Sequence, residues 1–326
     1  MSLVYRPRRN RKNESMRSLV RENIVTPKDL IAPLFVIEGK GKREEILSMP
    51  GYARLSLDLI IEEAKALWSL GVPCVSLFPA LSDSLKDSKA SESTNPDGLY
   101  QKTIQSLKDA IPEMLVMTDV ALDPYSSDGH DGYVDPKTGE ILNDESLDIL
   151  AKMAVSQAKA GSDIIGPSDM MDGRVGFIRK ALDEEGLSQT SIMSYTAKYA
   201  SHFYGPFREA LDSAPKSGDK KTYQMDYSNS EEAEREAYLD EKEGADILMV
   251  KPGLPYLDVI SRLKRVTHLP IAAYNVSGEY SMIKAASEKG WLDGEKVMVE
   301  SLTAFKRAGA DMVLTYFAKD MAKLLQ

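Results

Sequence analysis

The sequence predicts an α/β fold, a single (β/α)8 TIM barrel with an extended N-terminal arm. Three observations support this prediction: a length of 326 residues, an alternation of short β-branched runs with amphipathic stretches, and a turn motif that recurs before several strands. A barrel of this type needs about 250 residues, and such alternation is typical of a parallel sheet covered by helices. We expect residues 1–29 to form an arm that makes subunit contacts and residues 30–326 to form the catalytic barrel.

Eight runs rich in apolar and β-branched residues are the candidate strands, at residues 30–37, 72–78, 114–120, 163–166, 192–196, 246–250, 270–274 and 312–316. Helical stretches follow most of them, for example at residues 57–70, 99–110, 145–160 and 255–266. Eight strand–helix units are the number that closes a barrel.

A short motif recurs before three of the strands: AGSDI at 160–164, EGADI at 243–247 and AGADM at 308–312. In each, a glycine ends a helix and a brief turn leads to the next strand. Two turn-rich segments, 126–141 and 199–229, interrupt the alternation. Both follow the carboxyl ends of strands, the face of a barrel where active sites and lids are found.

Charge is distributed unevenly along the chain. Residues 1–21 carry seven Arg or Lys and one acid, which leaves 34 basic and 49 acidic residues, or a formal charge of −15, in the remainder. An acidic body repels a phosphate backbone, so we expect no nucleic-acid partner. A basic arm that embraces the acidic body of a neighbouring subunit accounts for the pattern and predicts a homo-oligomer, the alternative being a disordered tail.

Composition also bounds the cellular setting. The mean hydropathy is −0.30, and no run reaches the ~18 apolar residues of a membrane span, so we expect no membrane partner. The basic N-terminal residues lack the apolar core of a secretory signal. Cys74 is the single cysteine and lies in an apolar run, so it forms no internal disulfide. A cytoplasmic location is the expectation.

Two lysines follow directly on buried strands. Lys251 comes after an apolar run that ends at Val250, and Lys198 comes after the preceding strand candidate. Burial and a nearby second ammonium both lower the pKa of a lysine and leave an amine that can attack a carbonyl. Either lysine alone is more simply a surface residue. Because neighbouring strands supply them, we expect the pair to lie together.

The segments around both lysines resemble a known family. Residues 194–208 read SYTAKYASHFYGPFR and residues 249–253 read MVKPG. Both are similar to the lysine motifs of the porphobilinogen synthase family, also called the 5-aminolevulinate dehydratase family. Further similar blocks are RPRR at 6–9, APLFV at 32–36, GPSDMMDGR at 166–174 and AYNVSGEY at 273–280. The resemblance therefore extends from the arm to the last strands.

The resemblance implies that the chain condenses two molecules of 5-aminolevulinate, both bound in one site, to porphobilinogen in tetrapyrrole biosynthesis. It implies a Schiff base on each lysine, with Lys251 on the propionate side of the product and Lys198 on the acetate side. It also implies a homo-oligomer, usually an octamer, in this family.

Five further residues are implied to hold the two substrate carboxylates. On the acetate side they are Arg208 and Lys220, with Gln224 as a further hydrogen-bond donor. The family often has arginine in place of Lys220, and a lysine keeps the charge but loses the bidentate fork. On the propionate side, Ser277 and Tyr316 match the family's hydroxyl pair. Without the resemblance they are simply a helix-capping serine and a tyrosine at a strand end.

Acidic residues raise the questions of proton transfer and of metals. Asp119, at the end of the third strand candidate, is a candidate proton relay or a loop cap. Zinc-dependent relatives carry cysteines where this chain has Ala121, Asp123 and Asp131, so no zinc is expected there. We interpret the two aspartates as turn residues, with weak Mg²⁺ binding as the alternative. Glu236 matches an allosteric, non-catalytic Mg²⁺ site of bacterial relatives, whereas its helix alone suggests only a solvated face.

Two other functions remain alternatives. A class I aldolase is also a lysine-dependent barrel, but it needs one lysine, and the second lysine with its own carboxylate anchors argues against it. A non-catalytic relative that binds 5-aminolevulinate without turnover is the other, and the presence of both lysines argues against that.

Overall fold

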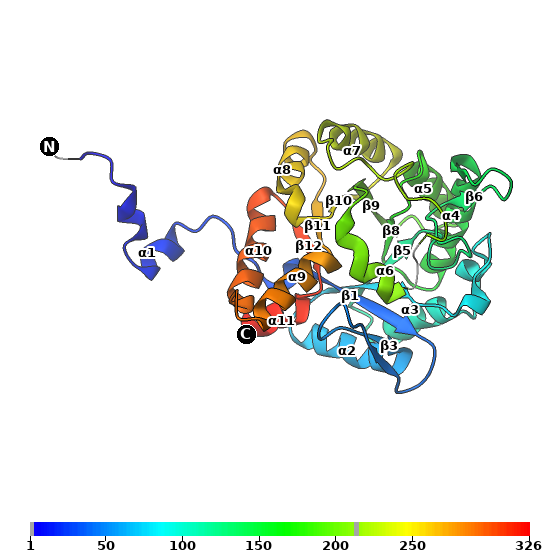
Figure 1. The fold of residues 1–326 in the computed structure, drawn as a ribbon, viewed down its shortest axis with the longest axis horizontal. Coiled ribbons are helices and arrows are strands. Elements are labelled where there is room, and N and C mark those ends of the chain that lie inside the picture. Colours follow the sequence, from blue (N-terminus) through cyan, green and yellow to red (C-terminus); the bar gives the residue numbers. More distant parts are fainter. Residues whose placement is uncertain (1–2, 212–214) are drawn as a thin grey trace.

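The computed structural model describes residues 3–211 and 215–326. Within these residues eight parallel strands follow one another around a ring, and the first pairs with the last, β1 with β12, to close it. Helices surround the ring on its outside (Figure 1). The predicted (β/α)8 barrel is therefore confirmed.

The barrel strands, in chain order, are β1 (Leu30–Ile37), β4 (Cys74–Pro79), β5 (Leu115–Val120), β8 (Ile164–Pro167), β9 (Ser191–Lys198), β10 (Ile247–Lys251), β11 (Ile271–Asn275) and β12 (Met312–Thr315). The helices are α1 (Glu14–Leu19), α2 (Leu57–Ser69), α3 (Leu99–Ala110), α4 (Asn143–Lys159), α5 (Arg174–Glu184), α6 (Gly205–Leu211), α7 (Glu231–Glu243), α8 (Leu257–Val266), α9 (Ser277–Glu288), α10 (Gly294–Ala308) and α11 (Ala318–Leu324).

The expected elements exist, but some boundaries and insertions differ from the prediction. The fifth barrel strand, β9, extends to Lys198, so this lysine ends the strand and does not follow it. β2 (Arg43–Glu45) and β3 (Ala53–Ser56) extend the sheet beside β1. The turn-rich segment after β5 contains a small hairpin, β6 (Tyr133–Val134) with β7 (Ile141–Leu142). The sequence did not predict these two short strands because the segment is rich in turn residues.

The recurring glycine motif has a clear structural role. Gly161, Gly244 and Gly309 have φ angles of 110°, 102° and 117°, which favour glycine. Gly244 and Gly309 directly follow α7 and α10, and Gly161 follows α4 after one intervening residue, Ala160. The aspartate two residues later in each motif accepts a hydrogen bond from the backbone of the neighbouring strand. These bonds join Asp163 to Val116, Asp246 to Ile192 and Asp311 to Ile271, at 2.8 Å each. The motif thus fixes adjacent strands at the amino-terminal end of the barrel.

The core consists of the strands and the inward faces of the helices. All eight residues of β1 are buried, as expected for a strand covered on both sides. In α8, Val259, Ile260 and Leu263 are buried at helical spacing, whereas Lys264 and Arg265 are exposed. Cys74 is also buried, as its apolar surroundings predicted.

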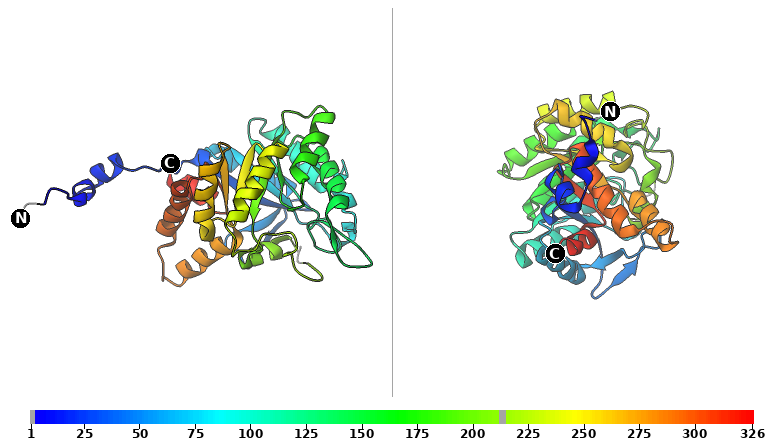
Figure 2. Two further views of the ribbon diagram at one scale, coloured as in Figure 1. Left: turned by 90° about the horizontal axis from the view of Figure 1, so that it is seen from above. Right: turned by 90° about the vertical axis from the view of Figure 1, so that its left-hand side faces the viewer.

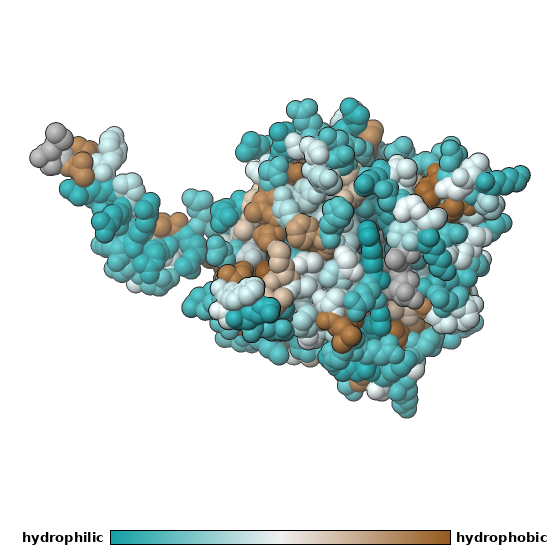
Figure 3. All heavy atoms as spheres, viewed as in Figure 1, coloured by the Kyte–Doolittle hydropathy of each residue, from teal (hydrophilic) through white to brown (hydrophobic). Residues whose placement is uncertain are grey.

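The N-terminal segment extends away from the barrel. Its short 3-10 helix, Pro7–Arg11, and α1 contain no buried residue, and Figure 2 shows both of them well clear of the barrel. Hydrophilic side chains dominate the surface of this segment (Figure 3), yet Tyr5 and Leu19 are 89% and 80% exposed. Glu14 forms ion pairs with Arg17 and Arg21.

None of the helices among the described residues is long and apolar enough to span a membrane.

Candidate active site

Lys198 and Lys251 end adjacent barrel strands. They are direct partners in the β9–β10 register, so their side chains leave the sheet on the same side. Both are buried, with 6% and 5% exposure. The expectation that the two lysines lie together at the carboxyl end of the barrel is therefore supported by strand register.

Aromatic rings surround the Lys251 amine. Its Nζ lies 4.7 Å from the ring centre of Tyr274, 4.9 Å from Phe207, 5.0 Å from Tyr195 and 5.3 Å from Tyr204. We call these four rings the aromatic box. Among the described residues, no hydrogen bond or ion pair holds this amine.

Burial, followed by the nearby charge of Lys198, lowers the pKa of Lys251 from 10.5 to about 7. Ring faces favour an ammonium by roughly 0.5–2 kcal/mol, whereas a shift of this size corresponds to about 5 kcal/mol against the charged form. Desolvation therefore prevails. A large share of Lys251 is a neutral amine near neutral pH, as a nucleophile requires.

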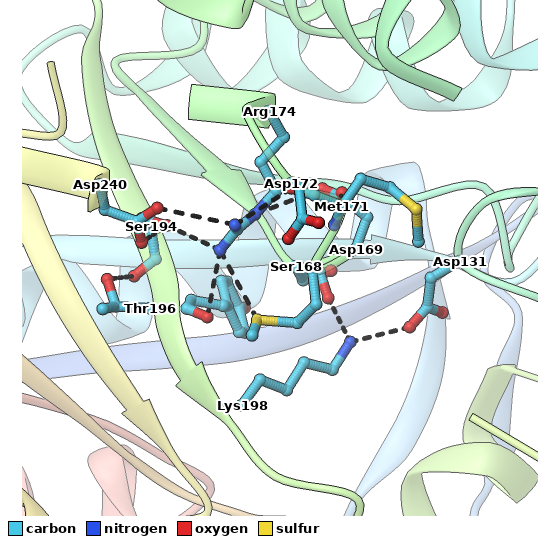
Figure 4. Close-up of polar contacts among 12 residues, drawn as sticks. Asp131, Ser168, Asp169, Met171, Asp172, Arg174, Ser194, Thr196, Lys198 and Asp240 are labelled. Carbon is cyan, nitrogen blue, oxygen red and sulfur yellow. Dashed lines mark hydrogen bonds and ion pairs between the residues drawn. The ribbon is translucent and has the colours of Figure 1, made fainter. Parts of the chain in front are cut away.

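Lys198 has the opposite surroundings. Its ammonium forms a 3.1 Å ion pair with Oδ2 of Asp131 and donates a hydrogen bond to the carbonyl oxygen of Ser168. Ser168 lies in the loop after β8, and Figure 4 shows both oxygens converging on the Lys198 nitrogen. Lys198 is therefore held by a carboxylate oxygen and a carbonyl oxygen, whereas Lys251 is surrounded by aromatic rings.

Asp131 gathers the residues expected on the acetate side. Its Oδ1 lies 2.6 Å from Nζ of Lys220, and its Oδ2 accepts a 3.3 Å hydrogen bond from Nε2 of Gln224. Lys220 also pairs with Asp123 at 3.3 Å. Burial by itself would raise the pKa of Asp131, but the ammonium groups of Lys198 and Lys220 outweigh it and hold this pKa well below its ordinary value.

The interpretation of Asp123 and Asp131 as ordinary turn residues needs correction. The backbone at Asp123 does form a turn, closed by a hydrogen bond from Tyr125 to Leu122. However, both carboxylates are buried and bind lysines from segments about 70 to 100 positions away in the chain. Sequence could not reveal this because local turn chemistry and long-range ion pairs use the same residue type.

Asp119 lies within β5 and is 7% exposed. Burial raises the pKa of its carboxyl to about 7; Lys251 and Lys198 act in the opposite direction, and Asp123 adds to the rise. Asp119 and Lys251 therefore titrate in the same range, which suits the exchange of a proton between a carboxyl and an amine.

The residues expected on the propionate side border the aromatic box. The hydroxyl of Tyr316 lies 3.0 Å from that of Tyr274, a member of the box. Ser277 begins α9, with Val276 as its N-cap, and its hydroxyl accepts a 3.0 Å hydrogen bond from the backbone of Phe207. Ser277 is therefore not an N-cap and instead holds α6, the helix that carries Phe207.

Arg208 follows Phe207 in α6. Its side chain is partly exposed and makes no hydrogen bond or ion pair with the described residues. Unlike Lys220 and Gln224, this arginine thus remains available for a ligand.

Sequence reasoning missed the aromatic box and a buried polar cluster beside Lys198. In that cluster the guanidinium of Arg174 contacts Asp240 at 3.6 Å and Asp169 at 3.9 Å, and it donates to the hydroxyl of Ser194 at 3.1 Å (Figure 4). The signal was present, since Arg174 and the box residues stand in the quoted motifs, but the sequence does not tell which rings face an amine.

Glu236 lies on α7 and lines a cavity of about 320 Å³. The lining also includes Glu232, Asp172 and Asp226. Burial raises the pKa of Glu236 to about 7, Arg174 opposes the rise, and nearby carboxylates including Asp172 add to it. The expectation of a merely solvated face is therefore too simple, because this carboxyl is partly buried among other acids.

A barrel that carries a depressed-pKa lysine beside a second buried lysine has the equipment of an enzyme that forms Schiff bases with carbonyl compounds. Comparison with known proteins gives the family. The family model described as delta-aminolevulinic acid dehydratase matches residues 4–324. The chain belongs to the delta-aminolevulinic acid dehydratase family.

Individual relatives agree over nearly the whole chain. The delta-aminolevulinic acid dehydratase of Bradyrhizobium diazoefficiens is 55% identical over 327 residues, covering 100% of this chain and 92% of the relative. That of Synechococcus elongatus is 54% identical and covers 99% of both chains. The crystal structure of the Toxoplasma gondii enzyme in complex with its reaction product porphobilinogen is 55% identical, with a TM-score of 0.97 and coverage of 99% and 92%.

Proposed function

We propose that this enzyme condenses two molecules of 5-aminolevulinate to porphobilinogen, with loss of two waters, through Schiff bases on Lys251 and Lys198. The product serves tetrapyrrole biosynthesis. Family membership over residues 4–324 supports the reaction. One observation carries the mechanism: the two lysines are register partners on β9 and β10, so two ketone substrates can be bound covalently side by side.

Lys251 reacts as a neutral amine. Its nitrogen attacks the ketone carbon of one substrate, and the resulting carbinolamine loses the former carbonyl oxygen as water to give an iminium. The departing hydroxyl needs a proton, and Asp119, whose pKa is raised to about 7, can supply it. The aromatic box excludes water that would otherwise hydrolyse the iminium. The iminium acidifies the adjacent C–H bond and so permits bond formation to the second substrate.

Lys198 binds the second substrate after it leaves its ion pair. In the ligand-free enzyme Asp131 holds Lys198, Lys220 and Gln224 at once. A substrate carboxylate offers Lys220 and Gln224 an alternative partner, and the partly exposed Arg208 adds a bidentate donor. When Lys220 leaves, Asp131 loses one of the two ammonium groups that hold its pKa down, while its burial still raises that pKa. Its carboxylate can then accept a proton from Lys198 and leave the neutral amine that attacks the second ketone.

The propionate-side carboxylate binds to Ser277 and Tyr316. Both hydroxyls already lie at the rim of the aromatic box, where each has one hydrogen-bond partner among the described residues. A hydroxyl pair can donate two hydrogen bonds to a carboxylate without adding a positive charge beside Lys251. A cationic anchor there would lower the pKa of Lys251 further, whereas neutral anchors leave it near 7.

Residues 199–229, of which the structure describes 199–211 and 215–229, act as a lid over the site. This segment contains α6 and supplies Phe207 to the box, Arg208 to the mouth, and Lys220 and Gln224 to Asp131. Residues 216–219 of the segment are exposed, whereas Lys220 is 8% exposed. A lid whose tip is accessible and whose inner residues bind carboxylates closes when substrate arrives.

Mg²⁺ binds at Glu236 as an allosteric, non-catalytic ion. The cavity of about 320 Å³ has room for an ion with its water shell. The carboxylates of Asp172, Asp226, Glu232 and Glu236 line this cavity and could hold a hydrated cation through its water shell. The ion would supply positive charge among the crowded carboxylates. Glu236 would hold it.

The positions Asp123 and Asp131 do not fit zinc. They offer oxygen and no thiolate, and Lys220 pairs with both carboxylates. Both carboxylates therefore serve as partners of lysines in the proposed reaction, and no metal is proposed at this place.

The enzyme assembles as a homo-oligomer, an octamer, through its arm. The arm is basic, none of the residues in its two helical turns is buried, and exposed apolar side chains lie along it. Contact with the acidic barrel of a second copy would cover both features. Residues 1–29 are accordingly the subunit-contact segment, and the cytoplasm is the proposed location.

Turnover tests the proposal directly. Purified enzyme is incubated with 5-aminolevulinate, Mg²⁺ and a zinc-selective chelator, and the pyrrole product is detected with Ehrlich's reagent. We expect colour that grows with time and is abolished by Lys251→Ala. Folded, Mg²⁺-replete enzyme that forms no pyrrole would contradict the proposal.

A further inference from the structure

A glutamate with no part in the mechanism above lies buried behind the propionate-side subsite. Glu279 belongs to α9 and has 0% exposure. Its Oε1 accepts hydrogen bonds from the backbone of Gly253 at 3.2 Å and Leu254 at 3.0 Å. Its Oε2 accepts a 2.6 Å hydrogen bond from the side chain of Asn275. The carboxyl group thus joins the loop after β10 to the end of β11.

The hydrogen bonds continue to the next strand. Asn275 Oδ1 accepts a 2.8 Å bond from the hydroxyl of Thr315, and that hydroxyl accepts one from the backbone of Phe317 at 3.1 Å. Asn275 and Thr315 are register partners at the ends of β11 and β12, and both have 0% exposure. A continuous buried network therefore links the carboxyl ends of β10, β11 and β12.

Each of these three strand ends carries one residue of the proposed propionate-side subsite. Lys251 ends β10, two residues before the amide of Gly253. Ser277 begins the helix that contains Glu279, and Tyr316 directly follows Thr315. The network touches none of the three side chains, yet it fixes the backbone on which all of them stand.

An ordinary helix-capping role does not account for these contacts. A glutamate three residues after the N-cap Val276 commonly accepts a hydrogen bond from the N-cap backbone, and Glu279 receives one from Val276 as well. Its other three donors, however, come from outside α9. Burial raises the pKa of Glu279 to about 8, and no lysine or arginine pairs with it among the described residues. Three donors outside its own helix indicate that this carboxyl group serves the strand ends it joins and not only the cap of α9.

We propose that Glu279 is a positioning residue for the Lys251 subsite, holding the ends of β10, β11 and β12 in the register that aims Lys251, Ser277 and Tyr316 at one substrate. On the opposite side, the backbone of Tyr199 and the hydroxyl of Tyr204 bind the Lys251 carbonyl at 2.9 Å and 3.1 Å. Loss of Glu279 therefore frees the subsite on one side only. The inference rests on the proposed function, because it takes Lys251 to be a Schiff-base lysine.

The test compares Glu279→Ala with Glu279→Gln. The side-chain oxygen of glutamine still accepts hydrogen bonds from the backbone N–H groups of Gly253 and Leu254. If the Asn275 side chain rotates, the glutamine NH2 group can donate to Asn275 Oδ1, so the network is preserved. Asp311→Asn is the matched control, since Asp311 also binds a strand backbone, that of Ile271, but at the opposite end of the barrel. Levulinate is reduced onto the enzyme with cyanoborohydride, and labelling at Lys251 and Lys198 is quantified separately by peptide mass spectrometry.

We expect Glu279→Ala to slow labelling of Lys251 by about 100-fold, the cost of an ångström-scale misplacement, and to leave labelling of Lys198 within about threefold of wild type. Glu279→Gln should restore most of the Lys251 rate, and Asp311→Asn should change neither lysine. With 5-aminolevulinate, the alanine variant should lose kcat more than it raises KM, because it disturbs orientation more than binding.

A milder variant provides a second test in case Glu279→Ala does not fold. Thr315→Val removes only the hydroxyl at the far end of the network, and we expect a loss of about fivefold confined to Lys251. Labelling of Lys251 at the wild-type rate in folded Glu279→Ala would overturn this inference alone, and so would equal losses at both lysines in Thr315→Val. Wild-type enzyme that never labels at Lys251 would overturn the proposed function and this inference with it.

Discussion

Replacing Phe207 with alanine should raise the pKa of Lys251 and slow its reaction near neutral pH. Phe207 lies 4.9 Å from the Lys251 amine and is the member of the aromatic box that belongs to α6 of the lid. Burial is the largest cause of the lowered pKa. Alanine opens one side of the box to water, which solvates the ammonium and restores part of its lost stability.

The magnitude follows from the position of the pKa. At pH 7 an amine with a pKa of about 7 is half neutral, whereas at the ordinary lysine value only about one molecule in 3000 is. A rise of one unit in the pKa of Lys251 therefore lowers the neutral fraction at pH 7 from about one half to about one eleventh, a roughly fivefold loss of rate, and each further unit lowers the rate by nearly tenfold. We expect a rise of at least about one unit. The loss of reaction rate should shrink as the pH increases, because at high pH Lys251 is a neutral amine in both the wild type and the variant.

The assay measures the rate of levulinate trapping at Lys251 by cyanoborohydride between about pH 5.5 and pH 10, a range that brackets both limits. The wild-type rate should rise through a midpoint near 7, and the midpoint of Phe207→Ala should lie higher. Phe177→Ala is the control, since Phe177 is 48% exposed on α5. A lower rate with an unchanged midpoint would mean that Phe207 binds substrate and does not set the pKa, which would refute the reasoning.

The remaining predictions concern the second lysine, the lid and the metal. Lys198→Ala should be inactive yet still label at Lys251, and activity within about tenfold of wild type would contradict two Schiff bases, because loss of covalent catalysis costs several kcal/mol. Limited proteolysis should cut the free enzyme at residues 215–221 and be suppressed by saturating levulinate; equal cleavage rates would rule out a closing lid. Glu236→Ala should keep basal activity but lose stimulation by Mg²⁺, and a mutant that is still stimulated would place the ion elsewhere.

The sequence was sufficient for the barrel and for the lysines. A strand buried on both faces is a continuous apolar run, so β10 and the lysine at its end can be recognised without any partner. The glycine at the end of a helix is equally local, because its positive φ is a property of one residue. Both kinds of signal depend on neighbours in the chain, and both predictions agree with the structure.

The surroundings of the lysines could not be predicted in this way. Tyr195, Phe207 and Tyr274 come from β9, α6 and β11, and only closure of the barrel brings them to one amine. Asp131 binds a lysine 67 positions away and another 89 positions away. An aspartate before a glycine predicts a turn, and nothing local distinguishes one that also pairs with distant lysines.

These surroundings imply an order for the two covalent steps. No counter-ion pairs with Lys251 among the described residues, and with a pKa of about 7 about half of this amine is already neutral at pH 7, so we expect it to capture the first substrate. In the proposed mechanism Lys198 must first break its 3.1 Å contact with Asp131. There, the carboxylate of the second substrate is the competitor that draws Lys220 and Gln224 away from Asp131. We therefore expect the second amine to be released only when its own substrate is present. On this proposal, an aromatic box at one lysine and a carboxylate at the other distinguish two chemically identical substrates.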